Sequence, residues 1–297
     1  MGLSLLNFTL GLICAPFMLG IINKTKAKFA GRKGDPLLQI YSDLLKLLGK
    51  GAVYSRTTTW VLRVAPSIGL SCVMIALAVV PLHGHASLIH FYGDLFFFIY
   101  ILGLMVFFTV LAALDTGSSF EGMGGSREVL FSLLAEPALI VGLCVFAKST
   151  GSVSLSEIIP NTSITQPVLI LVVLALFIVF LCENSRIPVD DPETHLELTM
   201  VHEVMVLDYS GPDFAFIMYG SAIKMWVLGM LIVEIILPLG DNGWFLSTLL
   251  SLLGMTTLAV VVGCVESIMA RLRLVSVPKL LVAADSLSIL AFILIRY

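Results

Sequence analysis

The chain is 297 residues long, with 58% hydrophobic residues, only 12% charged residues and a mean hydropathy of +1.03. This hydropathy lies outside the range of a water-soluble domain and excludes a soluble enzyme. The formal net charge of −3 and the absence of a basic groove with interleaved aromatic residues argue against nucleic-acid binding.

Eight apolar segments are each long enough to cross a bilayer, which takes roughly 20 residues of helix. Their unbroken hydrophobic runs favour helices over barrel strands, in which apolar and polar residues alternate. The predicted fold class is all-α, a polytopic membrane protein that forms a single transmembrane domain over residues 1–297. The predicted spans lie near residues 3–22, 62–81, 94–114, 128–148, 166–184, 214–238, 244–264 and 277–296.

The placement of lysine and arginine predicts the orientation of these spans. The first apolar run has neither a basic region before it nor a cleavage site after it, so we interpret it as a span rather than a signal peptide. Of the 17 lysine and arginine residues, 14 fall in or beside the connections that lead from odd-numbered to even-numbered spans. The positive-inside rule therefore places these connections in the cytoplasm and both termini outside.

The first cytoplasmic connection combines a basic stretch, residues 23–33, with an amphipathic segment. Asp35 followed by Pro36 is typical of an N-cap and the first position of a helix. Leucines then recur at helical spacing as far as Leu48. We expect an interfacial helix, too short to span, that acts as a membrane anchor, as a platform for a partner protein, or as both.

The second connection, residues 114–130, reads LDTGSSFEGMGGSREVL. Its glycines allow tight or left-handed backbone, but their spacing does not match a phosphate-binding loop. We expect the fourth span to begin near Glu128. Glu136 follows eight residues later, which places the two carboxylates near one helix face, roughly 12 Å apart along the axis.

The third connection, residues 183–211, is the most densely charged part of the chain. Asp191 and Pro192 again resemble the start of a helix, with Glu193 and Glu197 one turn apart on it. Two like charges at this spacing raise the pKa of one carboxyl group if the site is buried. The two histidines of this connection, His195 and His202, are candidates to titrate near neutral pH. The plain alternative is a solvated acidic loop without a role.

Other charged residues fall inside or at the edge of the predicted spans, where each costs roughly 2.5–3.5 kcal/mol on insertion scales. They are Asp115, Glu136, Glu183, Lys224, Glu234, Glu266 and Asp285. Such groups pair inside the bundle or mark an ion path, and Lys224 is expected to pair with a glutamate. The five cysteines are scattered singly, and the HExxH continuation is missing after His202, so neither an iron–sulfur nor a zinc site is expected.

Four stretches together resemble one family: GRKGDPLLQIYSDLLKLLGK, LDTGSSFEGMGGSRE, ENSRIPVDDPETHLEL with DYSG after it, and RLRL before the last span. The chain is similar, over essentially its whole length, to the complex I subunit 1 family. Within that family it resembles the branch of membrane-bound [NiFe]-hydrogenase and formate hydrogenlyase subunit 4. The short GRKGDP stretch favours this branch over the quinone-reducing one.

The resemblance implies a membrane anchor and proximal ion-conduit subunit that couples hydrogen evolution in a hydrophilic arm to proton or sodium translocation. It implies no cofactor in this chain, and a [NiFe] centre and iron–sulfur clusters in partner subunits. The implied partners are the hydrogenase large and small subunits, iron–sulfur subunits and antiporter-like membrane subunits, in the cytoplasmic (inner) membrane of a prokaryote. The implied ion-path residues are Glu128, Glu136, Glu183, Arg186, Asp190, Glu193, Glu197 and Lys224. The implied partner-interface residues are Arg32, Lys33, Arg127, Arg271 and Arg273.

Three alternative functions stay open at this point. The same scaffold is found in quinone-reducing complex I. A polytopic chain is also compatible with an independent secondary ion transporter, although neither internal repeats nor broken helices are evident. The third alternative is a passive anchor that moves no ions. Where the family has two acids around one residue, this chain has Glu193, Thr194 and His195, so the match to the family is weakest at His195.

Overall fold

The structure, a computed structural model, describes residues 2–81, 87–158, 166–191, 200–237 and 243–295. Within these ranges the secondary structure is entirely helical, which confirms the all-α fold class. The α-helices are α1 (Gly2–Phe29), α2 (Gln39–Leu48), α3 (Trp60–Val79), α4 (Asp94–Asp115), α5 (Ser119–Thr150), α6 (Leu155–Ile158), α7 (Gln166–Glu183), α8 (Gly211–Ile236), α9 (Trp244–Ile268) and α10 (Val277–Leu294). Two short 3-10 helices, η1 (Glu203–Val206) and η2 (Leu274–Ser276), precede α8 and α10.

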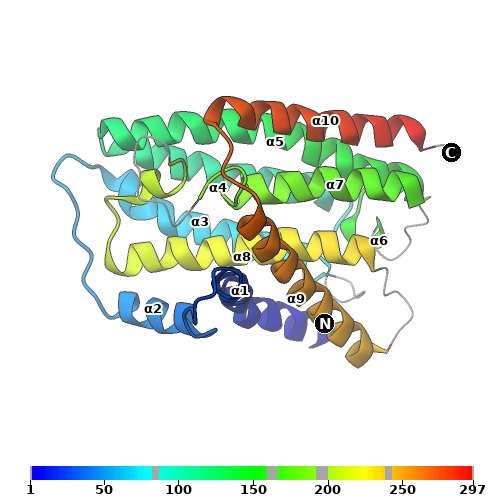
Figure 1. The fold of residues 1–297 in the computed structure, drawn as a ribbon, viewed down its shortest axis with the longest axis horizontal. Coiled ribbons are helices and arrows are strands. Elements are labelled where there is room, and N and C mark those ends of the chain that lie inside the picture. The colour runs from blue at the N-terminus through cyan, green and yellow to red at the C-terminus, as the bar shows by residue number, and fades with distance from the viewer. Residues whose placement is uncertain (1, 82–86, 159–165, 192–199, 238–242, 296–297) are drawn as a thin grey trace.

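Seven helices in the described part of the chain are long and apolar enough to cross a membrane, namely α1, α3, α4, α5, α8, α9 and α10. The apolar helix α7 is slightly shorter, and with it the number of membrane helices agrees with the predicted eight. An even number of crossings returns the chain to its starting side. Accordingly, both chain ends lie toward the same end of the long axis in Figure 1.

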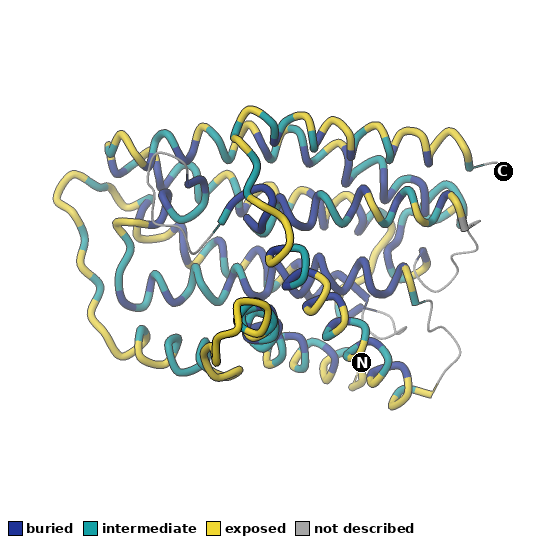
Figure 2. Tube along the Cα trace, viewed as in Figure 1, coloured by how far each residue is buried: buried dark blue, intermediate teal, exposed yellow. Residues whose placement is uncertain are grey.

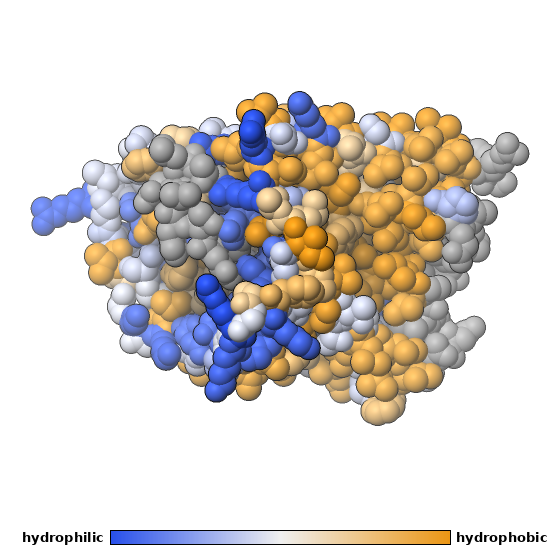
Figure 3. Space-filling model, viewed as in Figure 1, coloured by the Kyte–Doolittle hydropathy of each residue, from blue (hydrophilic) through white to orange (hydrophobic). Residues whose placement is uncertain are grey.

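The bundle is built around α8, which is buried along an unbroken run, residues 222–235. Most of the long helices run along the same axis, whereas α9 crosses them diagonally (Figure 1). Figure 2 shows burial concentrated on the inner faces, with exposed residues along the outer sides of α9 and α10. In Figure 3 the exposed surface is hydrophobic toward the end that holds the termini, and hydrophilic side chains gather at the centre and toward the opposite end.

The start of α2 differs from the expectation. The helix begins at Gln39 with Leu38 at the N-cap position, and Asp35 does not cap it. The Gln39 amide donates instead to the carbonyl of Pro36 at 3.0 Å, so Asp35 and Pro36 belong to a turn. No residue of α2 is buried in the chain, as an interfacial helix requires.

The start of α5 is a second correction, because the helix begins at Ser119 rather than near Glu128. The glycines of this stretch were expected to form a loop, and only Gly117 has a left-handed backbone, with φ of +69°. Gly124 is helical, and a Cβ atom there would lie 2.8 Å from the Val204 side chain and 2.9 Å from the Val201 carbonyl. Its role is therefore close packing of α5 against the segment that contains η1.

Candidate functional site

The connection that follows α7, residues 184–191, is folded into the bundle rather than exposed. Arg186 is 7% exposed and Asp190 only 2%. The turn is compact because the Arg186 amide donates to the Leu181 carbonyl at 2.8 Å, and the Val189 amide donates to the Arg186 carbonyl at 2.8 Å. The loop therefore carries its charged side chains into the protein interior, where they need partners.

The first ion pair of this region joins Glu183, just before the loop, to Lys224 in the buried part of α8. Its Nζ lies 2.7 Å from Oε2 of Glu183, the last residue of α7. The expected pairing of Lys224 with a glutamate is thus confirmed. Removing either member would leave an uncompensated charge inside the bundle, which is strongly unfavourable.

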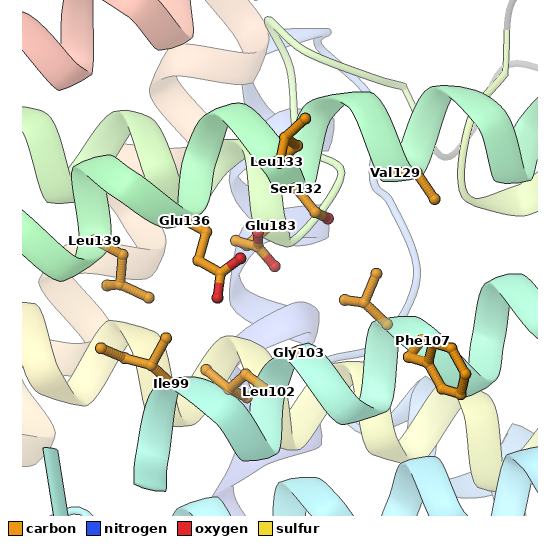
Figure 4. Close-up of a pocket in the computed structure, with 11 residues that line it drawn as sticks. Ile99, Leu102, Gly103, Phe107, Val129, Ser132, Leu133, Glu136, Leu139 and Glu183 are labelled. Carbon is orange, nitrogen blue, oxygen red and sulfur yellow. The ribbon is translucent and has the colours of Figure 1, made fainter. Parts of the chain in front are cut away.

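Beside this ion pair lies a cavity of about 240 Å³ between α4 and α5. Its walls are mostly apolar, with Leu102, Phe107 and Leu133 among the lining residues. Figure 4 shows the carboxylates of Glu136 and Glu183 entering the same space, one from α5 and the other from α7. Two carboxylates thus face the same cavity.

Glu128 lies in the same electrostatic environment, because its carboxyl group interacts with the charges of Lys224, Glu183 and Asp190. Glu128 and Glu136 therefore both lie near the Glu183–Lys224 pair. This placement agrees with their eight-residue spacing on one helix face.

A second group of ion pairs joins three distant parts of the chain. Glu266, 5% exposed on α9, lies with Oε1 3.4 Å from Nη1 of Arg186. Its Oε2 lies 3.2 Å from Nζ of Lys26, near the end of α1. Glu266 thus fixes the buried loop to two membrane helices at once.

Asp190 forms a third attachment of the loop. Its Oδ1 lies 2.6 Å from Nη2 of Arg271, in the connection between α9 and α10. Its Oδ2 accepts hydrogen bonds from the backbone amides of Val201 at 3.0 Å and His202 at 3.3 Å. In addition, the Leu272 amide donates to the Pro188 carbonyl at 2.9 Å. Asp190 therefore joins the loop to two other segments, the α9–α10 connection and the segment that begins η1.

The predicted partner-interface residues fall into two groups. Arg271 is held by Asp190, and Nη1 of Arg127 donates to the Met200 carbonyl at 2.8 Å, so both arginines stabilise the folded connections. Arg32, Lys33 and Arg273 instead lie on the surface. Glu193, Glu197 and His195 lie outside the described residues, so their predicted roles stay predictions.

His202 differs from the expectation that it titrates near neutral pH. Its side chain lines a cavity of about 20 Å³ together with Tyr209. Burial, reinforced by the charge of Lys224, lowers the pKa of His202 to about 4. The imidazole is therefore neutral at neutral pH. Among the described residues, no group of three or more His, Cys, Asp or Glu side chains is arranged to hold a metal ion.

Two contributors to the site were missing from the predicted ion-path set. Glu266 is a charge within a predicted span, and Lys26 belongs to a basic stretch, but nothing in the sequence links the two residues to each other. A buried carboxylate was also missed near the start of α5, where Oε1 of Glu121 accepts the Asp208 amide at 3.2 Å. The sequence predicts a glycine-rich loop at Glu121, and a loop position gives no reason to expect burial.

Comparison with known proteins gives consistent results. The family model described as NADH dehydrogenase matches residues 2–296. Formate hydrogenlyase subunit 4 of Escherichia coli K12 is 30% identical over 289 residues, covering 94% of this chain and 93% of that protein. Hydrogenase-4 component C of the same organism is 32% identical over 292 residues, covering 95% and 91%. The fold is also that of a chain in the archaeal membrane-bound sulfane sulfur reductase, with a TM-score of 0.83, 22% identity, and 98% and 100% coverage.

Proposed function

The chain belongs to the NADH dehydrogenase family, and we propose that it is the membrane anchor and proximal ion-conduit subunit of a multisubunit membrane-bound [NiFe]-hydrogenase. Relatives named as subunits of formate hydrogenlyase and hydrogenase-4 support this choice within the family. In this proposal, electron transfer and hydrogen evolution take place in a hydrophilic arm. This subunit couples them to the translocation of protons or sodium ions across the cytoplasmic membrane.

The proposal assigns the redox centres, a [NiFe] centre and iron–sulfur clusters, to partner subunits. The hydrogenase large and small subunits and the iron–sulfur subunits contact the hydrophilic end of the bundle, which includes the exposed Arg32, Lys33 and Arg273. Antiporter-like subunits contact the membrane part. Both termini lie outside the cell in this arrangement, because the basic connections then face the cytoplasm.

The observation that carries the proposal is the series of ion pairs along the 184–191 loop. At one end of the loop, Glu183 pairs with Lys224 at 2.7 Å beside the cavity that contains Glu136. At the other end, Asp190 pairs with Arg271 at 2.6 Å. Arg271 is a predicted partner-interface residue, and Asp190 is also three residues from Glu193, a predicted ion-path residue. One short loop therefore connects the predicted partner surface with two carboxylates inside the bundle.

Coupling through this loop is electrostatic in the proposal. A charge pair about 4 Å apart interacts by roughly 4 kcal/mol at an effective dielectric constant near 20. A shift of the loop that separates Lys224 from Glu183 would leave two carboxylates facing the same cavity. Their mutual repulsion favours proton uptake by one of them. The return of Lys224 then favours release of that proton.

The test uses the intact complex reconstituted in lipid vesicles, with hydrogen evolution and the ion gradient measured together. Glu136→Gln removes one titratable group with little change in size. We expect the gradient formed per hydrogen to fall about tenfold or more, as for loss of a proton-transferring group, while hydrogen evolution continues.

The matched control is Glu157→Gln, which changes an exposed carboxylate on α6, away from the cavity. It should leave both measurements unchanged. Full coupling in Glu136→Gln would refute the ion path through the cavity. A wild-type complex that evolves hydrogen without any gradient would instead establish a passive anchor.

A further inference from the structure

A second pocket, of about 520 Å³, lies beside the end of α1 and is separate from the cavity that contains Glu136. Asn23, Lys26 and Phe29 contribute to it from α1, and Ser267 from the end of α9. Arg32 and Asp35 line it from the turn that follows α1. It is thus a pocket between two membrane helices, closed on one side by a turn.

The turn that forms this wall is held in place by several contacts. The Arg32 amide donates to the Ala27 carbonyl at 2.8 Å, and Nζ of Lys24 donates to the Lys33 carbonyl at 2.7 Å. Gly34 has a left-handed backbone, with φ of +62°, and a Cβ atom on it would collide with the Cβ atom of Ala27. The chain therefore folds back tightly on α1, which places the Arg32 side chain at the pocket.

The lining has the chemistry of a phosphate site. Arg32 supplies positive charge, and Asn23 and Ser267 supply uncharged polar groups. Lys26 adds a second cation, whose charge is shared with Glu266 at 3.2 Å, and Asp35 is the single carboxylate in the lining. Guanidinium groups bind phosphate oxygens with two parallel hydrogen bonds, and ammonium groups bind them as point charges. The pocket is large enough for a phosphate together with part of the molecule that carries it.

The surroundings of the pocket identify that molecule as a lipid. Phe29 is 57% exposed, Ile268 at the end of α9 is 75% exposed, and Met269, which follows it, is 48% exposed. Figure 3 shows hydrophilic side chains over the end of α1 directly against the hydrophobic surface of the bundle. A small water-soluble phosphate would leave these apolar side chains uncovered, whereas the acyl chains of a phospholipid would cover them.

We propose that the pocket between the ends of α1 and α9 binds the headgroup phosphate of an anionic phospholipid. Basic pockets between membrane helices are typical sites for such headgroups, and each nearby lysine or arginine contributes about 1 kcal/mol. Arg32 is the main phosphate ligand, and Phe29 and Ile268 contact the acyl chains. The site depends on the turn as well as on charge, because the turn positions Arg32.

The test measures lipid binding to the purified full chain by native mass spectrometry, with phosphatidylglycerol and phosphatidylcholine as probes. We expect clear retention of phosphatidylglycerol over phosphatidylcholine. Arg32→Gln should weaken phosphatidylglycerol binding about fivefold, the loss expected for one phosphate-binding charge. Arg56→Gln, which removes an exposed arginine of the α2–α3 connection, is the matched control and should have no effect.

Gly34→Ala is a second variant, because it displaces the turn without changing any charge. It should also weaken phosphatidylglycerol binding, and its melting temperature shows whether the chain stays folded. Equal binding of the two lipids, or equal effects of Arg32→Gln and Arg56→Gln, would overturn the proposal. It would also be overturned if inorganic phosphate displaced phosphatidylglycerol at the same concentration as the lipid.

Discussion

Two carboxylates, the mostly buried Glu183 and the fully buried Asp94, show how differently the same chemical group is used in this bundle. Asp94, fully buried at the start of α4, accepts hydrogen bonds from the Ser154 hydroxyl at 2.9 Å and the Leu155 amide at 2.7 Å. These donors are uncharged, and both belong to the short segment around α6. Asp94 therefore fastens that segment to α4.

Glu183 has a partner of another kind. Lys224 carries a full charge at the end of a long side chain, and a cavity lies beside its partner Glu183. A second carboxylate, Glu136, faces the same cavity. Burial alone therefore does not identify a functional acid. The informative features are a charged partner and an adjacent cavity that is also lined by another titratable group.

The largest expected effect on stability comes from Lys224→Met, which leaves the Glu183 carboxylate buried without its cation. The free energy of unfolding of the purified chain should fall by about 3–5 kcal/mol, the usual cost of breaking a buried ion pair. Chemical unfolding in detergent measures this change. Adding Glu183→Gln should recover part of the loss, because the double variant has no unpaired charge at this site. A single variant as stable as the wild type would show that the pair is not buried as described.

The next largest effect is expected for Asp94→Asn, which tests whether Asp94 has a structural role only. The amide group cannot accept both hydrogen bonds as well as a carboxylate does, so unfolding should become easier by about 2 kcal/mol. Hydrogen evolution and the ion gradient of the reconstituted complex should stay at wild-type levels. Loss of the gradient at normal hydrogen evolution would place Asp94 on the ion path and end the distinction between the two acids.

A feature of this chain is predictable from the sequence when it depends on residues that are close together along the chain. The spans were predictable because hydropathy acts over about 20 adjacent residues. A glutamate partner for Lys224 was predictable because a lone charge in a span needs compensation. The link between Glu266 and Lys26 was not, since the two residues are 240 positions apart and meet only after α1 and α9 pack together. At Gly124, local preference indicated a loop, but packing against Val201 produced a helix.

The smallest expected effect concerns His202, whose environment favours the neutral imidazole. Its pKa is about 4 in the folded chain, against an ordinary value near 6.5, so its contribution to stability is complete above pH 6.5 and is lost as the pH falls toward 4. Between pH 7 and 5.5 the wild type should lose about 1 kcal/mol through this group. His202→Gln should show a flatter dependence when unfolding is measured at both pH values. Equal slopes for the two proteins would mean that His202 titrates normally, and the neighbourhood of Lys224 would then be more open to water than that of Asp94.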